Sequence, residues 1–387
     1  MKIVNSVIFL ILITTLSFST ILPGLEKVWA DEVVATVNVG EFPRSVKYNP
    51  SNDLIYVANS DSGTISIIDP GSNRVISTLD VGIRPIDIEY NPSNEYVYVA
   101  NSGGTSVSVI DSSSNTVIET IEVGNRPTDI EFNPSNNDMY VVNRNSDSVS
   151  VIDSASNRVI TTIPVGDTPR SIEYNPQNRY MYTANFNSNS VSVIDTSSNT
   201  VVTTIGGLSE VILLQYNPNN HDLYAVKQGS FSISVIDTST NAIITSIPAG
   251  DSEGFNSAEY NPINNYVYVG NDATGNITVI DSRTNTIADV IYTGVSTGPL
   301  SIKYNPSNHN IYVGNADSNT VSVIGTVPLS SEGVLGSGNL GSGNNVNIQV
   351  QENHGDNVGG QSGFGGTYSD SPILQGQSTE QDSQVVS

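Results

Sequence analysis

The side chains best suited to chemistry recur at nearly regular intervals in the first half of the chain. One set is cationic, and each member precedes or opens a run of alternating residues: Arg44, Arg84, Arg126 and Arg170. A second set is anionic and falls within the same runs: Asp87, Glu89, Asp129, Glu131 and Glu173. A planar guanidinium group grips a carboxylate or sulfated group through paired hydrogen bonds, and neighbouring carboxylates can hold a calcium or magnesium ion.

These residues belong to a repeat that is built from strands. An Asn-Pro pair recurs seven times, with its proline at Pro50, Pro92, Pro134, Pro176, Pro218, Pro262 and Pro306. One unit, residues 82–123, holds four alternating or β-branched segments, "GIRPIDIEYNP", "EYVYVANSGG", "TSVSVID" and "NTVIETIEVG". Each segment is bounded by turn-forming residues, which predicts four strands, named a to d. Four strands in about 42 residues match the size of one propeller blade.

The count of strands predicts how the ring closes. Strands a, b and c each occur seven times, but no strand d follows Gly325. Residues 33–40, "VVATVNVG", have the pattern of strand d and no blade of their own. We therefore predict an all-β, seven-bladed β-propeller in which the N-terminal strand completes the last blade and leaves no unpaired edge.

The two ends of the chain differ from the repeat. Residues 1–30 combine Lys2, an apolar stretch and "VWA", which predicts a cleaved signal peptide and a secreted or cell-surface protein; an uncleaved membrane anchor is the alternative. The propeller is assigned to residues 31–326. Residues 327–387 are rich in Gly, Ser, Asn and Gln and are predicted to form a disordered tail. Self-association through this tail is a further expectation.

Charge and composition exclude several classes of function. The formal net charge is −24 and the isoelectric point is near 4.1, so the field of the protein repels nucleic acid and anionic membranes. The chain has no cysteine, so neither a disulfide nor thiol chemistry contributes. Stability must then come from burial of apolar side chains and from closure of the ring.

The second strand of each unit carries a motif that resembles a known family. It reads "YVAN" at residues 56–59 and 98–101, "YVVN" at 140–143, "YTAN" at 182–185, "YAVK" at 224–227 and "YVGN" at 268–271 and 312–315. With "VSVID" following, residues 33–325 resemble the YVTN family of β-propeller repeats, found in archaeal surface-layer and bacterial exported proteins. The resemblance implies a secreted or surface-displayed scaffold and carries no catalytic motif.

Two other sets of polar residues recur once in nearly every blade. One set ends the c strands: Asp69, Asp111, Asp153, Asp195, Asp237 and Asp281. We interpret these as turn formers rather than metal ligands, because each lies in a different blade. The other set ends the b strands: Asn59, Asn101, Asn143, Asn185, Asn271 and Asn315. These could contact sugars or simply form turns. Asn276 begins the single glycosylation sequon in the repeats.

The arginines and the strand-a carboxylates are expected on one face of the ring, where the d-to-a and b-to-c loops meet. Strand a is the innermost strand, so its polar side chains should approach the central channel, with Lys47, Gln215 and Lys303 at equivalent positions. One interpretation is a pocket at the channel mouth that binds an anion and a cation. The other is that arginines and carboxylates pair with each other and connect the blades.

The three histidines do not support catalysis at this mouth. His221 and His309 follow a-to-b turns on the opposite face, and His354 is in the tail, so neither a Ser-His-Asp triad nor a histidine metal site can form there. We predict a non-enzymatic scaffold without a cofactor that binds an extracellular protein or glycan. The alternative is a lactonase-like hydrolase or lyase that uses the carboxylates with a calcium or magnesium ion.

Overall fold

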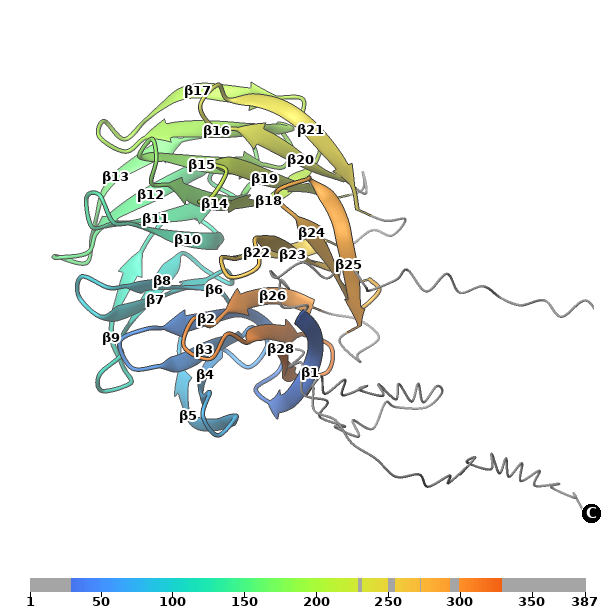
Figure 1. Ribbon diagram of the computed structural model, residues 1–387. Coiled ribbons are helices and arrows are strands. Elements are labelled where there is room, and N and C mark those ends of the chain that lie inside the picture. Colours follow the sequence, from blue (N-terminus) through green and yellow to red (C-terminus); the bar gives the residue numbers. More distant parts are fainter. Residues whose placement is uncertain (1–28, 229–231, 250–254, 272, 293–298, 329–387) are drawn as a thin grey trace, which may run out of the picture. The chain divides into compact units, whose positions relative to one another are not determined.

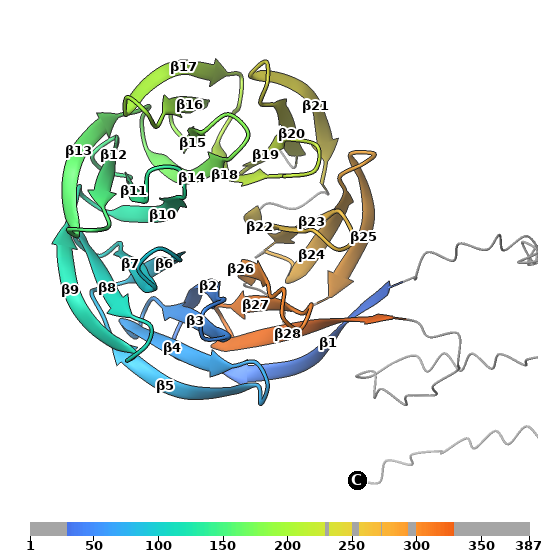
Figure 2. The same ribbon diagram turned by 60° about the vertical axis from the view of Figure 1, so that its left-hand side comes forward.

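The computed structural model describes residues 29–228, 232–249, 255–271, 273–292 and 299–328. Among them the regular secondary structure consists of β-strands, arranged as seven antiparallel four-stranded sheets around a central axis (Figures 1 and 2). The predicted all-β, seven-bladed propeller is confirmed. Most of the predicted signal peptide and nearly all of the predicted tail lie outside the described residues.

Each blade contributes one strand to each of four concentric positions. The a strands are innermost: β2(Pro43–Asn49), β6(Pro85–Asn91), β10(Pro127–Asn133), β14(Pro169–Asn175), β18(Val211–Tyr216), β22(Phe255–Asn261) and β26(Pro299–Tyr304). The b strands follow: β3(Leu54–Asn59), β7(Tyr96–Asn101), β11(Asp138–Asn143), β15(Tyr180–Asn185), β19(Asp222–Lys227), β23(Tyr266–Asn271) and β27(Ile311–Asn315). The c strands are β4(Thr64–Asp69), β8(Ser106–Asp111), β12(Ser148–Asp153), β16(Ser190–Asp195), β20(Ser232–Asp237), β24(Asn276–Asp281) and β28(Thr320–Pro328). The d strands form the outer wall: β5(Arg74–Asp80), β9(Thr116–Glu122), β13(Arg158–Pro164), β17(Thr200–Gly206), β21(Ala242–Pro248), β25(Thr286–Tyr292) and β1(Trp29–Asn38).

The core lies between neighbouring blades rather than within one. A typical cluster combines Tyr56 and Ile65 of the first blade with Ile88 and Val97 of the second. The b strands are buried on both faces, whereas the outer d strands alternate between exposed and partly buried residues. Since each sheet is two-sided, it can bury both apolar faces only by packing against a blade on either side.

The N-terminal strand closes the ring as predicted. Strand β1 pairs antiparallel with β28, with Val37 opposite Val321 and Asn38 opposite Thr320, and it completes the sheet β1-β28-β27-β26. Figure 2 shows β1 on the outside of this last blade. The pairing continues as far as Trp29 opposite Pro328, so the strands extend two residues beyond the predicted limits of 31 and 326.

The aspartates that end the c strands form turns, as the sequence analysis favoured. Each accepts a hydrogen bond of 2.8–3.0 Å from the backbone N–H two residues later. Four residues after each aspartate, an asparagine adopts a left-handed φ of 51–56°, which this residue type tolerates. Hydrogen bonds from a side chain two or three residues later, and then these backbone bonds, hold the pKa of each of the six carboxyls below its usual value.

The tyrosine of the YVTN-like motif fastens one blade to the next. In five blades its buried hydroxyl donates to an asparagine in the c-to-d turn of the following blade, at 2.6–3.1 Å: Tyr56 to Asn115, Tyr98 to Asn157, Tyr140 to Asn199, Tyr182 to Asn241 and Tyr224 to Asn285. The asparagine four residues before each tyrosine donates to the same hydroxyl. The motif is therefore structural.

Substitution of Tyr140 by Phe tests this contact. The change removes the hydroxyl that lies between Asn136, which is exposed, and Asn199, which is partly buried. The loss of these hydrogen bonds costs about 1 kcal/mol of unfolding free energy. The measurement is the midpoint of urea denaturation. Tyr96→Phe is the control, because the Tyr96 hydroxyl makes no hydrogen bond to a described residue. Equal midpoints for the two variants would contradict the role assigned to Tyr140.

Candidate functional site

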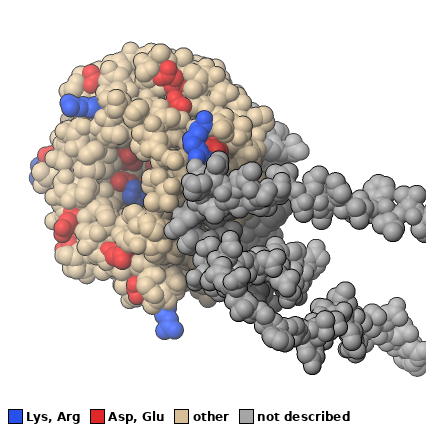
Figure 3. Space-filling model, in the orientation of Figure 1, with Lys and Arg blue, Asp and Glu red and all other residues tan. Residues whose placement is uncertain are grey.

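The seven a strands line a channel along the axis of the ring. The channel encloses about 260 Å³ and is lined by residues from every blade. Figure 2 shows β2, β6, β10, β14, β18, β22 and β26 around the central opening. Figure 3 shows a hollow in which acidic and basic side chains lie together. The expectation that the polar side chains of strand a approach the axis agrees with this lining.

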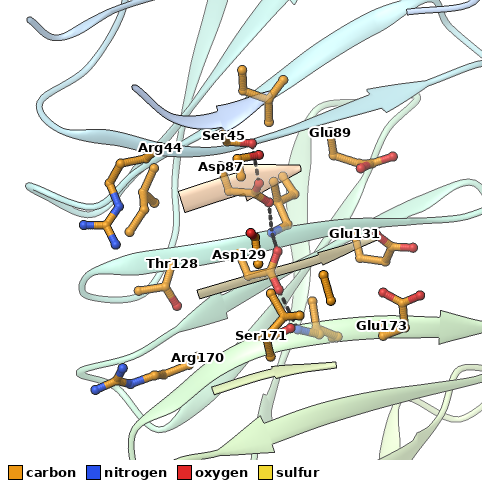
Figure 4. A pocket seen from close by; sticks show the side chains of 18 of the residues that line it. Arg44, Ser45, Asp87, Glu89, Thr128, Asp129, Glu131, Arg170, Ser171 and Glu173 are labelled. Atoms are coloured by element: carbon orange, nitrogen blue, oxygen red, sulfur yellow. Dashed lines mark hydrogen bonds between the residues drawn. The ribbon is translucent and has the colours of Figure 1, made fainter. Parts of the chain in front are cut away.

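A bulge at the second residue of the a strand turns one side chain toward the channel in blades one to five. In the first blade, Pro43 pairs with Asn59 and Ser45 with Ala58, so Arg44 is left without an opposite residue. The same shift occurs at Thr128 and Arg170. Such bulges re-aim a side chain at the rim of a sheet. Figure 4 shows Arg44, Thr128 and Arg170 on one side of the strands, away from the glutamates.

Arg170 is held in a defined orientation at this mouth. Its guanidinium carbon lies 3.9 Å from the centroid of the Phe186 ring, and its Nη1 donates to Oε1 of Gln228 at 3.3 Å. Stacking on an aromatic face and a hydrogen bond to a neutral amide fix the group without neutralising it. Arg144 lines the same cavity.

Arg144, Phe186 and Gln228 were missed by the sequence analysis. They share one position, the residue that follows the end of strand b, and Ser60, Ser102 and Ala316 occupy it in other blades. Their loops hydrogen-bond to the d-to-a loops of the same blade, as in Arg144 N to Arg126 O at 3.0 Å. The sequence did carry a signal that could have identified them. The residue after strand b is small in several blades and large in these three, and it lies on the predicted face of d-to-a and b-to-c loops.

The arginines repel one another electrostatically. Burial lowers the pKa of Arg170 to about 10, with further lowering by Arg144, Arg126 and Arg44. Burial and then Arg126 also lower the pKa of Arg144. Both groups remain cationic at neutral pH, so the mouth concentrates positive charge on an otherwise acidic protein.

The third residue of the a strands connects neighbouring blades. Asp87 Oδ2 accepts from the backbone N–H of Ile130 at 3.0 Å, and Asp129 Oδ2 accepts from that of Ile172 at 2.7 Å. Ser45 Oγ donates to Asp87 Oδ1 at 2.8 Å. Figure 4 shows these bonds as a chain across successive blades. The carboxylates therefore do connect the blades, but they bind backbone N–H and hydroxyl groups rather than arginine.

The fifth residue of the a strands forms an acidic tier below the aspartates. Glu89 pairs with Lys47, and Glu259 pairs with Lys303 at 2.9 Å. Glu173 Oε1 accepts from the backbone N–H of Tyr216 at 2.9 Å. The three ion pairs between described residues are these two and Arg283–Asp281.

Burial and electrostatic interactions shift the pKa values of the charged groups in this tier and next to it. Burial, then Glu89 and Glu173, raise the pKa of Glu131 well above its ordinary value. Burial, then Asp87, likewise raises the pKa of Asp129. Burial raises the pKa of Glu173 to about 7. Burial lowers the pKa of Lys47, but attraction to the carboxylates of Glu89 and Glu131 is stronger, so the net effect is a raised pKa for this ammonium group.

The structure separates the predicted site residues into two groups. Those that line the channel are Arg44, Asp87, Glu89, Asp129, Glu131, Arg170 and Glu173. Arg84 and Arg126 are exposed in the d-to-a loops and do not line it. Within the described ranges, no group of three or more His, Cys, Asp or Glu side chains is arranged to hold a metal ion.

The asparagines at the ends of the b strands are not available to sugars. Asn101 is 1% exposed, and its Nδ2 donates to Ser106 and Ser108 at 3.2 and 2.9 Å. A Cβ on Gly82 would lie 2.4 Å from the Asn101 Cγ, so the glycine is required for this close approach. The interpretation of these asparagines as a sugar-binding rim is wrong.

The sequon and two histidines lie away from the channel mouth. Asn276 begins β24, and Thr278 is buried in that strand, so the sequon is not presented on a loop. His221 and His309 follow the a-to-b turns, where each Nδ1 is 2.7 Å from a tyrosine hydroxyl. None of the described residues forms a helix that is long and apolar enough to cross a membrane.

The fold and its sequence identify a family. The sequence model of the YNCE-like beta-propeller family matches residues 26–296. The chain belongs to the YNCE-like beta-propeller family. No curated protein matches the sequence. Among solved structures, the chain is similar to Kuenenia stuttgartiensis Hydrazine Synthase, with 20% identity and a TM-score of 0.66 over 74% of this chain and 96% of that chain. At this identity, the likeness concerns the fold alone.

The acidic tier predicts how stability depends on pH. The pKa of Glu173 is about 7 in the folded protein and near 4.5 when unfolded, so the folded state binds the proton more tightly. Stability should therefore fall as pH rises from about 4.5 to 7. Glu173→Gln retains an oxygen acceptor for Tyr216 and should reduce this fall by roughly 1–3 kcal/mol.

The measurement is the free energy of unfolding of both proteins across that pH range. Glu41→Gln, which changes an exposed carboxylate in a d-to-a loop, is the matched control and should leave the slope unchanged. A Glu173→Gln protein with the native pH dependence would show that Glu173 does not carry the buried proton.

Proposed function

We propose that this YNCE-like propeller is an exported binding scaffold that recognises an anionic group of an extracellular protein or glycan. Recognition takes place on the face formed by the d-to-a and b-to-c loops. The observation that carries the proposal is the orientation of Arg170, which stacks on Phe186, donates to Gln228 and lines the same cavity as Arg44 and Arg144. The YVTN-like motif and the leader-like residues 1–30 support export and display on the cell surface.

Electrostatics supports an anionic ligand. Arg170 and Arg144 are partly buried, and neither makes an ion pair with a described residue. Burying like charges side by side is unfavourable unless a counter-charge binds between them. A carboxylate or sulfate at the mouth would accept paired hydrogen bonds from these guanidinium groups and relieve their repulsion.

The acidity of the whole protein supports selectivity for a localised site. A net charge of −24 repels an anionic partner over most of the surface. The arginines at the mouth attract an anionic group, whereas the rest of the surface repels it. This combination favours a partner whose negative charge lies at a terminal group that can reach the mouth. Repulsive elements of this kind raise specificity as much as attractive contacts do.

The roles of the channel carboxylates support binding over hydrolysis. Asp87 and Asp129 accept backbone N–H bonds from the next blade, and Glu89 is paired with Lys47. Groups that hold the ring together are poorly placed to move toward a substrate or to gather around a divalent cation. We therefore propose a non-enzymatic role that needs no cofactor.

Glycan-array binding of the full-length exported protein tests the proposal, with sulfated and uronate-containing glycans beside their neutral counterparts. The native protein should prefer the anionic members, and Arg170→Gln should weaken this binding by about tenfold or more. Arg44→Gln should act in the same direction. The control is Arg158→Gln, which removes the same charge from an exposed position on β13.

Two results would count against the proposal. One is native binding that does not distinguish anionic from neutral glycans. The other is an equal loss of binding in Arg170→Gln and Arg158→Gln, because it would attribute the effect to net charge rather than to the mouth. An anionic peptide library read with the same variants extends the test to protein partners.

A further inference from the structure

We propose that the axial channel itself binds a small organic anion with an apolar body, such as a short aliphatic or aromatic carboxylate. Its charged group lies at Arg44, Arg144 and Arg170, and its apolar part lies against the wall formed by blade five. The inference rests on the proposed function because it uses the same arginines, and it names the chemical class that the channel takes.

The channel wall is most apolar at blade five. At the second residue of strand a, blades one, three and four carry Arg44, Thr128 and Arg170, whereas blades two and five carry Ile86 and Ile212. At the third residue, blades one to four carry Ser45, Asp87, Asp129 and Ser171, whereas blade five carries Leu213. Ala258 of blade six also lines the channel, at the fourth position, which is apolar in every blade. Leu213 is therefore the one apolar residue at the third position, and together with Ile212 it makes blade five the most apolar part of the lining.

Several buried polar atoms in the lining have no partner among the described residues. They are Arg170 Nε, Thr128 Oγ1 and Ser257 Oγ. Ser257 is only 5% exposed, so its hydroxyl is removed from bulk solvent. Buried polar groups are nearly always satisfied, and orphaned ones indicate a missing ligand or water. Donors at Arg170 and Thr128, on the same side of the strands (Figure 4), are suited to an oxyanion.

The size of the channel limits the ligand. At about 260 Å³ the space is below the roughly 300–1,000 Å³ of sites for drug-sized molecules. A glycan chain or a folded partner cannot enter, although a terminal group can. A free anion of about ten non-hydrogen atoms is on the order of what such a cavity holds.

The charges along the axis orient the ligand. Asp87, Asp129 and the glutamate tier repel an anion from the deeper part of the channel, so the charged group stays at the arginine end. Ile212, Leu213 and Ala258 offer no hydrogen bonds to sugar hydroxyls. Burying such hydroxyls against this wall is unfavourable, and burying a hydrocarbon group there is favourable. The lining therefore selects an apolar carboxylate over a sugar acid.

Isothermal titration calorimetry of the full-length protein with three probes tests the inference: benzoate, glucuronate and inorganic sulfate. Benzoate should bind at least about tenfold more tightly than glucuronate, as expected when roughly 50 Å² of apolar surface is buried. Leu213→Ser introduces the residue found in four other blades at this position, and it should weaken benzoate by about three- to tenfold without changing sulfate. Arg170→Gln should weaken benzoate and sulfate together.

Two further variants serve as controls. Ile212→Thr introduces the residue of blade three at its position and should repeat the effect of Leu213→Ser. Because Ile212 also packs in the core between blades five and six, its variant is compared only if it melts like the native protein. Val202→Ser changes an exposed aliphatic residue on the outer strand β17 and should leave every affinity unchanged. Thermal melting of each variant confirms that the ring is intact.

The outcomes separate this inference from the proposed function. Two outcomes overturn the apolar-anion class but leave the arginine mouth in place. One is that glucuronate binds as tightly as benzoate. The other is that Leu213→Ser and Ile212→Thr leave the affinity for benzoate unchanged. Failure of all three probes to bind, together with no preference for anionic glycans, overturns both. Anionic glycan binding with no small-anion binding restricts recognition to the surface of the mouth and refutes a ligand in the channel.

Discussion

A blade of this protein cannot bury both of its faces alone, and this constraint governs the whole structure. Each sheet places residues such as Ile65 and Ile88 against a neighbouring blade, so the only arrangement without an exposed apolar face is a closed ring. Closure depends on backbone hydrogen bonds between β1 and β28 at opposite ends of the repeats. Because no disulfide is possible, these bonds and interblade contacts such as Tyr140–Asn199 hold the seam and the ring.

Ring closure also creates the channel and its electrostatics. Seven innermost strands meet at the axis, so side chains from different repeats become neighbours there. Some of the charged side chains stabilise the ring: Asp87 and Asp129 accept backbone N–H hydrogen bonds from the next blade. The remaining charged groups are separated along the axis: guanidinium groups lie at the mouth, and carboxyl groups with raised pKa values lie below them. The anion site that we propose uses the same geometry that stabilises the ring.

The repeat separates structural residues from candidate binding residues. Positions filled in the same way in most blades, such as Tyr56 and Asn101, are buried and hydrogen-bonded within or between blades. The residue at the position of Arg44 differs from blade to blade, and in blades one to five it lines the channel. A position that makes the same contacts in every blade is restricted to one residue type. A position in the channel lining that makes no such contacts can vary, and its residue can then serve ligand binding.

The sequence by itself determined the strands, the turns, the number of blades and the closing role of residues 33–40, because alternation, Asn-Pro turns and a missing fourth strand are local features of the chain. It also placed Asp87 and Glu131 near the axis. Only the tertiary structure showed that a bulge turns Arg44 and Arg170 into the channel, that Arg144 joins them, and that Asn101 is buried. These outcomes depend on distances across a closed ring, which no single repeat specifies.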